Sequence, residues 1–128
     1  MEQHTRDTVV YIVDDDESVR KGLSRLMRSA GIKNQIYNSA ESFLDQVDTD
    51  SQGCILLDIT MSRMSGLELG QQLKDRGIGY PIIVVSAIDD ETTRHAAYEL
   101  GVRFFLRKPV DDQALLDAIT WVMSERHG

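Results

Sequence analysis

Carboxylates gather at two places where an apolar run of the chain ends. After the run TVVYIV come Asp14, Asp15, Asp16 and Glu17, and after the run CILL comes Asp58. Oxygen ligands without histidine or cysteine favour Mg²⁺, Mn²⁺ or Ca²⁺ over Zn²⁺. A compact site with few carboxylates suits Mg²⁺, which keeps several waters and can share a phosphoryl oxygen. If the two places meet in space, the sequence predicts a magnesium site.

A hydroxyl and an ammonium group stand at the ends of two later apolar runs. Ser86 ends the run IIVVS, and Lys108 follows FFLR directly before Pro109. Both side chains can donate hydrogen bonds to phosphoryl oxygens, and a carboxylate can form an acyl phosphate. A metal ion and an ammonium group together neutralise the charge of a transferring phosphoryl group. The combination therefore predicts phosphoryl transfer to one carboxylate.

The elements that must position these residues alternate along the chain. Apolar runs predict strands over Thr8–Asp14, Asn34–Tyr37, Cys54–Asp58, Ile82–Ser86 and Phe104–Leu106. Amphipathic spacing and caps predict helices from about Val19 to Ala30, after Ser39, over Gly66–Arg76, over about Asp90–Leu100, and from Asp111 or Asp112 onward. Such alternation predicts a parallel sheet with helices on both faces. Ligands of these sheets bind at the carboxyl ends of the strands, where the candidate residues stand.

Composition limits the possible partners. The 128 residues predict a single domain, residues 1–128 with a structured core of about 8–125. The chain has 21 acidic and 14 basic residues, a net charge of −7, which disfavours direct binding of nucleic acid. Its apolar runs are too short to cross a membrane, and its start does not have the pattern of a signal peptide. The single cysteine, Cys54, suits a reducing cytoplasm.

The motifs that contain these residues resemble the receiver domain of bacterial two-component response regulators. They are VDDDE, LLDITMSRMSG, VVSA and GVRFFLRKPV, and the resemblance covers essentially the whole chain. Their order and spacing are specific, although each motif alone is weak. The spacing is most similar to receivers whose regulators end in a helix-turn-helix domain. The resemblance implies a flavodoxin-like (βα)5 three-layer sandwich with strand order 2-1-3-4-5.

The resemblance also implies a role for each residue of the site. Asp58 is expected to be the phosphoacceptor nucleophile. Mg²⁺, or Mn²⁺ in its place, is expected to bind Asp15, Asp58 and the backbone carbonyl of Thr60 directly, and Asp14 mainly through a bound water. Lys108 is expected to pair with the phosphoryl group. The phosphoryl donor would be a sensor histidine kinase or a phosphotransfer domain.

A conformational switch is implied as well. Ser86 is the expected switch hydroxyl and Phe105 the expected switch aromatic, and the Lys108–Pro109 peptide bond is expected to be cis. Phosphorylation would alter the surface of the fourth helix, fifth strand and fifth helix, and so control dimerisation or an output domain that regulates transcription. Because Thr60 and Ile88 offer no acid or amide to orient water, we expect slow self-dephosphorylation.

One position departs from the family pattern: Ser62 replaces the proline of D-x-x-M-P-x-M-x-G. This leaves the order of the loop and the rate of phosphorylation open. The sequence also leaves open the cognate kinase, the dimer geometry, and whether a longer regulator extends beyond this chain.

Two other classes of protein share parts of the pattern. A phosphatase of the haloacid-dehalogenase type also uses an aspartate nucleophile after a strand, but it needs a second aspartate where this chain has Thr60. A flavodoxin-like binding module would need a loop rich in Ser, Thr and Gly after the first strand, where this chain has Asp-Asp-Asp-Glu.

Overall fold

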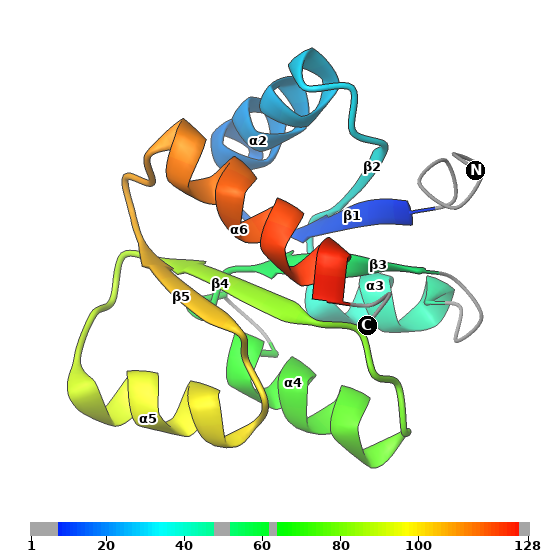
Figure 1. Ribbon diagram of the computed structural model, residues 1–128. Helices are drawn as coiled ribbons and strands as arrows, with labels where there is room; N and C mark the ends of the chain where they lie inside the picture. The colour runs from blue at the N-terminus through cyan, green and yellow to red at the C-terminus, as the bar shows by residue number, and fades with distance from the viewer. Residues whose placement is uncertain (1–7, 48–51, 62–63, 126–128) are drawn as a thin grey trace.

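The computed structural model describes residues 8–47, 52–61 and 64–125 (Figure 1). Strands and helices alternate throughout this part of the chain. The strands are β1 (Thr8–Val13), β2 (Asn34–Tyr37), β3 (Gln52–Leu57), β4 (Ile82–Ser86) and β5 (Phe104–Arg107). The helices are α2 (Glu17–Ser29), α3 (Ala40–Gln46), α4 (Gly66–Asp75), α5 (Glu91–Glu99) and α6 (Asp112–Glu125). Every predicted strand and helix is present, with shifts of a few residues at the ends.

The strands form one parallel sheet in the order β2-β1-β3-β4-β5, which confirms the predicted topology. In this sheet Val13 of β1 pairs with Leu57 of β3. The next residues of the two strands, Asp14 and Asp58, therefore leave the sheet side by side. The backbone N–H of Asp58 continues the ladder by donating to the carbonyl of Val13 at 3.1 Å.

Helices cover both faces of the sheet, so alternate residues of the central strands enter two separate cores (Figure 1). On one face, α3, α4 and α5 pack over an aromatic group in which the rings of Tyr11 and Tyr80 stack with centroids 5.5 Å apart. On the other face, α2 and α6 pack over Ile12, Leu56 and Ile83. Because the central strands are buried on both faces, they are apolar at almost every position.

Side-chain caps place the start of each of four helices, from α2 to α5. Asp16 caps α2 by accepting from the backbone N–H groups of Ser18 and Val19, so this carboxylate belongs to the helix start rather than to a metal site. Ser65 and Glu68 form a reciprocal capping box at the start of α4. These caps fix where the loops after β1 and β3 end.

No helix in the part of the chain that the structure describes is long and apolar enough to cross a membrane.

Candidate functional site

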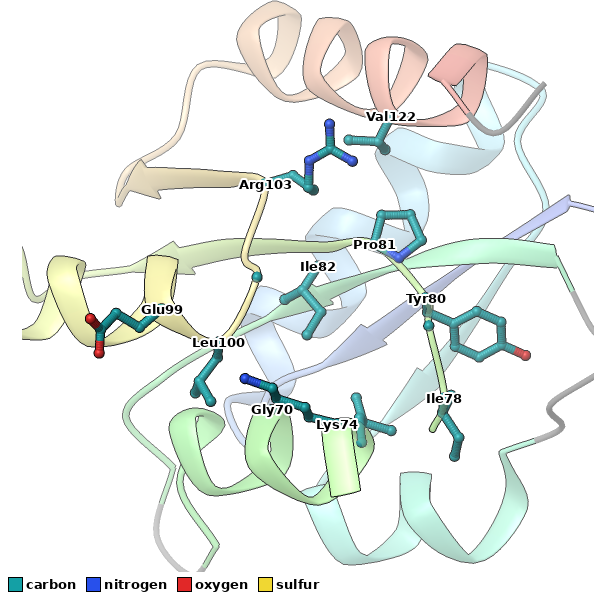
Figure 2. Close-up of a pocket in the computed structure, with 13 residues that line it drawn as sticks. Gly70, Lys74, Ile78, Tyr80, Pro81, Ile82, Glu99, Leu100, Arg103 and Val122 are labelled. Carbon is teal, nitrogen blue, oxygen red and sulfur yellow. The ribbon is translucent and has the colours of Figure 1, made fainter. Parts of the chain in front are cut away.

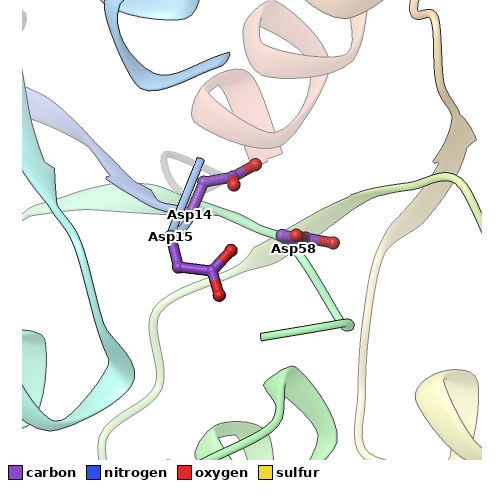
Figure 3. Close-up of side chains that lie close together, drawn as sticks. All are labelled: Asp14, Asp15 and Asp58. Carbon is purple, nitrogen blue, oxygen red and sulfur yellow. The ribbon is translucent and has the colours of Figure 1, made fainter. Parts of the chain in front are cut away.

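The ends of β1 and β3 bring Asp14, Asp15 and Asp58 together in an acidic cluster (Figure 3). Each carboxylate offers one oxygen atom, and these three atoms lie within 4.8 Å of one another. Asp14 and Asp58 are buried, whereas Asp15 is exposed. The cluster therefore lies at the surface with one side open to solvent, as a site that exchanges ligands must be.

Backbone and side-chain donors orient the two buried carboxylates. Asp14 Oδ1 accepts from the backbone N–H of Asp16 at 2.9 Å, which ties the carboxylate to the turn that starts α2. Asp58 Oδ1 accepts from the backbone N–H of Thr60 at 3.1 Å and from its hydroxyl at 3.2 Å. The second oxygen of each carboxylate is thereby directed toward the neighbouring strand ends.

Lys108, which follows the edge strand β5, contacts the acidic cluster. Its ammonium nitrogen lies 3.2 Å from Asp14 Oδ2 and 3.6 Å from Asp58 Oδ2. The backbone N–H of Lys108 donates to the carbonyl of Ser86 at 2.8 Å, and the Lys108–Pro109 peptide bond is cis, as predicted. A lysine that contacts two carboxylates from a different strand confirms that the predicted strand ends meet in space.

The electrostatics of the cluster are unfavourable for a fully ionised state. Burial raises the pKa of Asp58 above its ordinary value, and the charge of Asp14 raises this pKa further. Lys108 and the Thr60 hydrogen bonds act in the opposite direction but do not overcome this effect. A divalent cation would relieve the repulsion, and the all-oxygen donor set is that of a hard cation, so the residues fit a metal site.

The two predicted switch residues lie on the adjacent strands β4 and β5 and make contacts outside the acidic cluster. Ser86 is fully buried at the end of β4, and its hydroxyl oxygen accepts from the backbone N–H of Ile88 at 3.0 Å. Phe105 of β5 is partly buried, and the guanidinium carbon of Arg94 lies 5.6 Å from its ring centroid. Ser62, the departure from the family pattern, lies outside the described residues.

Two residues that support the site were not predicted to do so. Arg20 of α2 donates to the backbone carbonyl of Asp14 at 2.8 Å. The sequence carries a signal for this contact. A cation such as Arg20 near the N-terminus of a helix is unfavourable unless it has an acceptor nearby. Gly66 at the start of α4 packs so closely that a Cβ atom there would lie 2.6 Å from the carbonyl oxygen of Asp58.

A hollow of about 430 Å³ lies away from this site, at the amino ends of β4 and β5 (Figure 2). Lys74, Tyr80, Pro81 and Arg103 are among the residues that line it. It forms where α4 and α5 end and the chain turns back toward the sheet. None of the acidic-cluster residues reaches it, so the carboxylate chemistry and this hollow occupy opposite edges of the sheet.

The chain belongs to the response regulator receiver domain family. The family model with this description matches residues 10–120, which include the acidic cluster, Ser86 and Lys108. A parallel sheet in the order 2-1-3-4-5 with three carboxylates at its carboxyl edge is therefore the receiver fold and its acidic pocket.

Several relatives are similar over most of this chain. The response regulator protein TodT of Pseudomonas putida is 40% identical over 114 residues, which are 89% of this chain and 50% of that protein. The transcriptional regulatory protein TdiR of Thauera aromatica is 40% identical over 112 residues, 88% of this chain and 49% of that protein. The solved structure of the response regulator StyR matches with a TM-score of 0.87 at 40% identity, covering 94% of this chain and 63% of that one. The chain thus spans about half the length of these curated relatives.

Proposed function

We propose that this chain is a phosphorylation-dependent signalling receiver in which Asp58 accepts a phosphoryl group from the phosphohistidine of a histidine kinase or phosphotransfer domain. The observation that supports this most directly is the position of Lys108 between Asp14 and Asp58. An ammonium group at this position can form an ion pair with a phosphoryl group on Asp58. Asp14 lies beside Asp58 and can help to hold a cation. Membership of the receiver family supports the same reaction.

The geometry favours Asp58 Oδ2 as the attacking oxygen. Oδ1 already accepts two hydrogen bonds from Thr60, whereas Oδ2 is directed toward Lys108. In the transfer, a bond forms between this oxygen and phosphorus while the bond from phosphorus to the histidine nitrogen breaks. The electron pair of the broken bond stays on the histidine nitrogen, which can then take up a proton. Lys108 already lies beside Asp58 Oδ2, so it can pair with the new negative charge without a large movement.

Mg²⁺, or Mn²⁺ in its place, would neutralise charge on the transferring group when bound at the acidic cluster. Asp15, Asp58 and the backbone carbonyl of Thr60 would hold it directly. Asp14 would act mainly through a bound water, because its two oxygens already accept from the backbone of Asp16 and from Lys108. The exposure of Asp15 leaves the metal side of the cluster open to exchange with solvent.

The output of the switch would be the surface formed by α5, β5 and α6. Ser86 would move toward the phosphoryl group and Phe105 would turn inward, so this surface would change and control homodimerisation or an output domain. The description of the relative TdiR as a transcriptional regulatory protein supports regulation of transcription as the result. We place the protein in the cytoplasm and expect the phosphoryl group to be lost slowly.

A phosphorylation assay with small donors tests this proposal. The protein is incubated with phosphoramidate and Mg²⁺, and intact-mass spectra are recorded for the wild type, Asp58→Asn and Asp45→Asn. Asp45 is an exposed aspartate of α3 and serves as the control. We expect one added phosphoryl group on the wild type and on Asp45→Asn, and none on Asp58→Asn. We also expect EDTA to abolish the addition, because the transfer depends on the cation.

Either of two results would refute the proposal. One is a wild-type mass that stays unchanged with Mg²⁺ and excess donor. The other is an equal addition to Asp58→Asn, which would place the phosphoryl group on another residue.

A further inference from the structure

The ring of Phe105 is covered by a guanidinium group that is itself held in place. The guanidinium carbon of Arg94, in the first half of α5, lies 5.6 Å from the ring centroid, within the range of a cation–π contact. The same guanidinium forms an ion pair with Asp89. The Arg94 side chain is 41% exposed and the Asp89 side chain is 28% exposed, so water screens this pair in part.

Asp89 connects three parts of the proposed switch. It stands in the loop between β4 and α5, three residues after Ser86 and directly after Ile88. Ile88 is the residue whose backbone N–H donates to the Ser86 hydroxyl at 3.0 Å. Asp89 also lies 3.9 Å from a guanidinium nitrogen of Arg107 at the end of β5. One carboxylate therefore joins the loop of the switch hydroxyl to α5 and to β5, the strand that contains Phe105.

We propose that Arg94 is a positioning residue that holds Phe105 in the partly exposed orientation seen here, and that Asp89 links this hold to the position of Ser86. This inference rests on the proposed function, because it concerns how the phosphorylation signal reaches Phe105. It assigns a role to two residues of this chain outside the acidic cluster.

The contacts give the link a direction. If Ser86 moves its hydroxyl toward a phosphoryl group on Asp58, the hydroxyl must leave the backbone N–H of Ile88. The loop then shifts together with Asp89, and the ion pair that orients Arg94 is disturbed. Without this ion pair, Arg94 loses more conformational entropy when its guanidinium stays over the ring. The contact with Phe105 is then weaker, so the ring turns inward more easily. Both ends of the link thus bias one two-state element, the orientation of Phe105.

The first test measures the ring itself without any phosphoryl group. Aromatic ¹³C NMR spectra of Phe105 are compared for the wild type, Arg94→Ala, Arg94→Lys and Asp89→Asn. The control is His95→Ala, which removes an exposed side chain paired at 3.3 Å with Glu99. We expect Arg94→Ala and Asp89→Asn to increase the inward population of the ring, with Arg94→Lys between them and the wild type. We expect no change in His95→Ala.

The second test measures the affinity for beryllofluoride, a phosphoryl mimic, with saturating Mg²⁺. If Arg94 stabilises the resting orientation, its loss favours the liganded state, so Arg94→Ala should bind the mimic about 2- to 5-fold more tightly. Asp89→Asn should show a similar gain. Arg94→Ala combined with Asp89→Asn should gain little more than either alone, because the two residues act on Phe105 through one contact.

The outcomes separate this inference from the proposed function. If the wild type does not bind the mimic, the proposed function fails, whereas the NMR comparison still reports on Arg94. If the wild type binds but Arg94→Ala changes neither the ring population nor the affinity, Arg94 is only a surface cation and the inference is wrong. Weaker binding by Arg94→Ala would also overturn it, because Arg94 would then support the activated orientation.

Discussion

The residues of the acidic cluster have opposing effects on the ionisation of Asp58. Asp58 is buried and has a second carboxylate, Asp14, beside it, and both features raise the energy of its ionised form. The proposed phosphoryl transfer nevertheless needs the ionised form of Asp58, and Lys108 and Thr60 favour that form in part. The remaining cost is one that a cation at the cluster would lower. The ionised Asp58 is therefore expected to lower the stability of the cation-free protein.

This cost leads to a prediction about stability and pH. Because the native pKa of Asp58 lies above its ordinary value of 3.8, the native state binds a proton more tightly than the unfolded chain does. Above the native pKa, Asp58→Asn should therefore raise the free energy of unfolding, by about 1.4 kcal/mol for each unit of pKa shift. The gain should shrink as the pH falls through the native pKa and level off below 3.8. Urea unfolding in EDTA at several pH values measures it.

Asp45→Asn is the matched control for this prediction, because it makes the same substitution at an exposed aspartate of α3, outside the acidic cluster. A difference between Asp58→Asn and the wild type that stays constant from neutral to acid pH would contradict the argument. It would show that folding leaves the proton affinity of Asp58 unchanged.

Sequence reasoning identified Asp14, Asp15 and Asp58 because their position after apolar runs determines where they lie in a parallel sheet. It could not assign the partners of Arg94 or Asp89 in the same way. These side chains are long, or lie in a loop, and the residues that they contact depend on packing between elements. Such contacts follow from the fold and cannot be read from local spacing.

At the scale of elements, the packing of α4 against the end of β3 determines where Asp58, the proposed nucleophile, lies. The backbone of Gly66 approaches the end of β3 so closely that a Cβ atom would lie 2.6 Å from the carbonyl oxygen of Asp58 and 2.7 Å from Ile59 Cα. The backbone N–H of Gly66 donates to the carbonyl of Ile59 at 2.9 Å, which ties the start of α4 to the residues that follow β3. Position 66 therefore requires a glycine, because the backbone of α4 approaches the backbone after β3 too closely for a side chain.

Gly66→Ala should separate α4 from the end of β3. Both contacts are with backbone atoms that cannot rotate away, so we expect a loss of roughly 1–3 kcal/mol in unfolding free energy. Phosphorylation by phosphoramidate should slow, since the shift displaces Asp58. Gly22→Ala is the control, because nothing lies within 4 Å of its added Cβ and it sits within α2. It should raise the unfolding free energy by about 0.5–1 kcal/mol and leave phosphorylation unchanged. Equal stability of the two variants would contradict the packing argument.

The elements themselves were predictable because hydrophobic spacing follows the period of each structure. The ends of the elements were less predictable. β1 ends at Val13, one residue before the predicted end, because the Asp14 side chain turns into the loop and accepts from the backbone N–H of Asp16. The apolar pattern of α5 is weak, since within it only Ala97 is buried. That helix is held partly by polar contacts, such as the Asp90 cap and the ion pair of Arg94.

At the scale of the molecule, the surface around β5 exposes groups suited to the homodimer interface proposed above. Tyr98, on α5, is 46% exposed and lies one helical turn after Arg94. Arg103 precedes β5 and Arg107 is its last residue, so the surface offers cations and an aromatic ring on a chain with a net charge of −7. Two copies of such a chain repel at long range, and association needs a local gain in complementarity.

We therefore expect beryllofluoride with Mg²⁺ to convert a monomer into a dimer. Sedimentation velocity should show this shift for the wild type and none for Asp58→Asn. Tyr98→Ser should weaken the dimer while leaving binding of the mimic intact, because Tyr98 is exposed and lies outside the acidic cluster. Ile36→Ser, an equally exposed apolar residue of β2 at the other edge of the sheet, is the matched control and should dimerise like the wild type. If the wild type binds the mimic and remains a monomer at every concentration tested, this surface is not a homodimer interface.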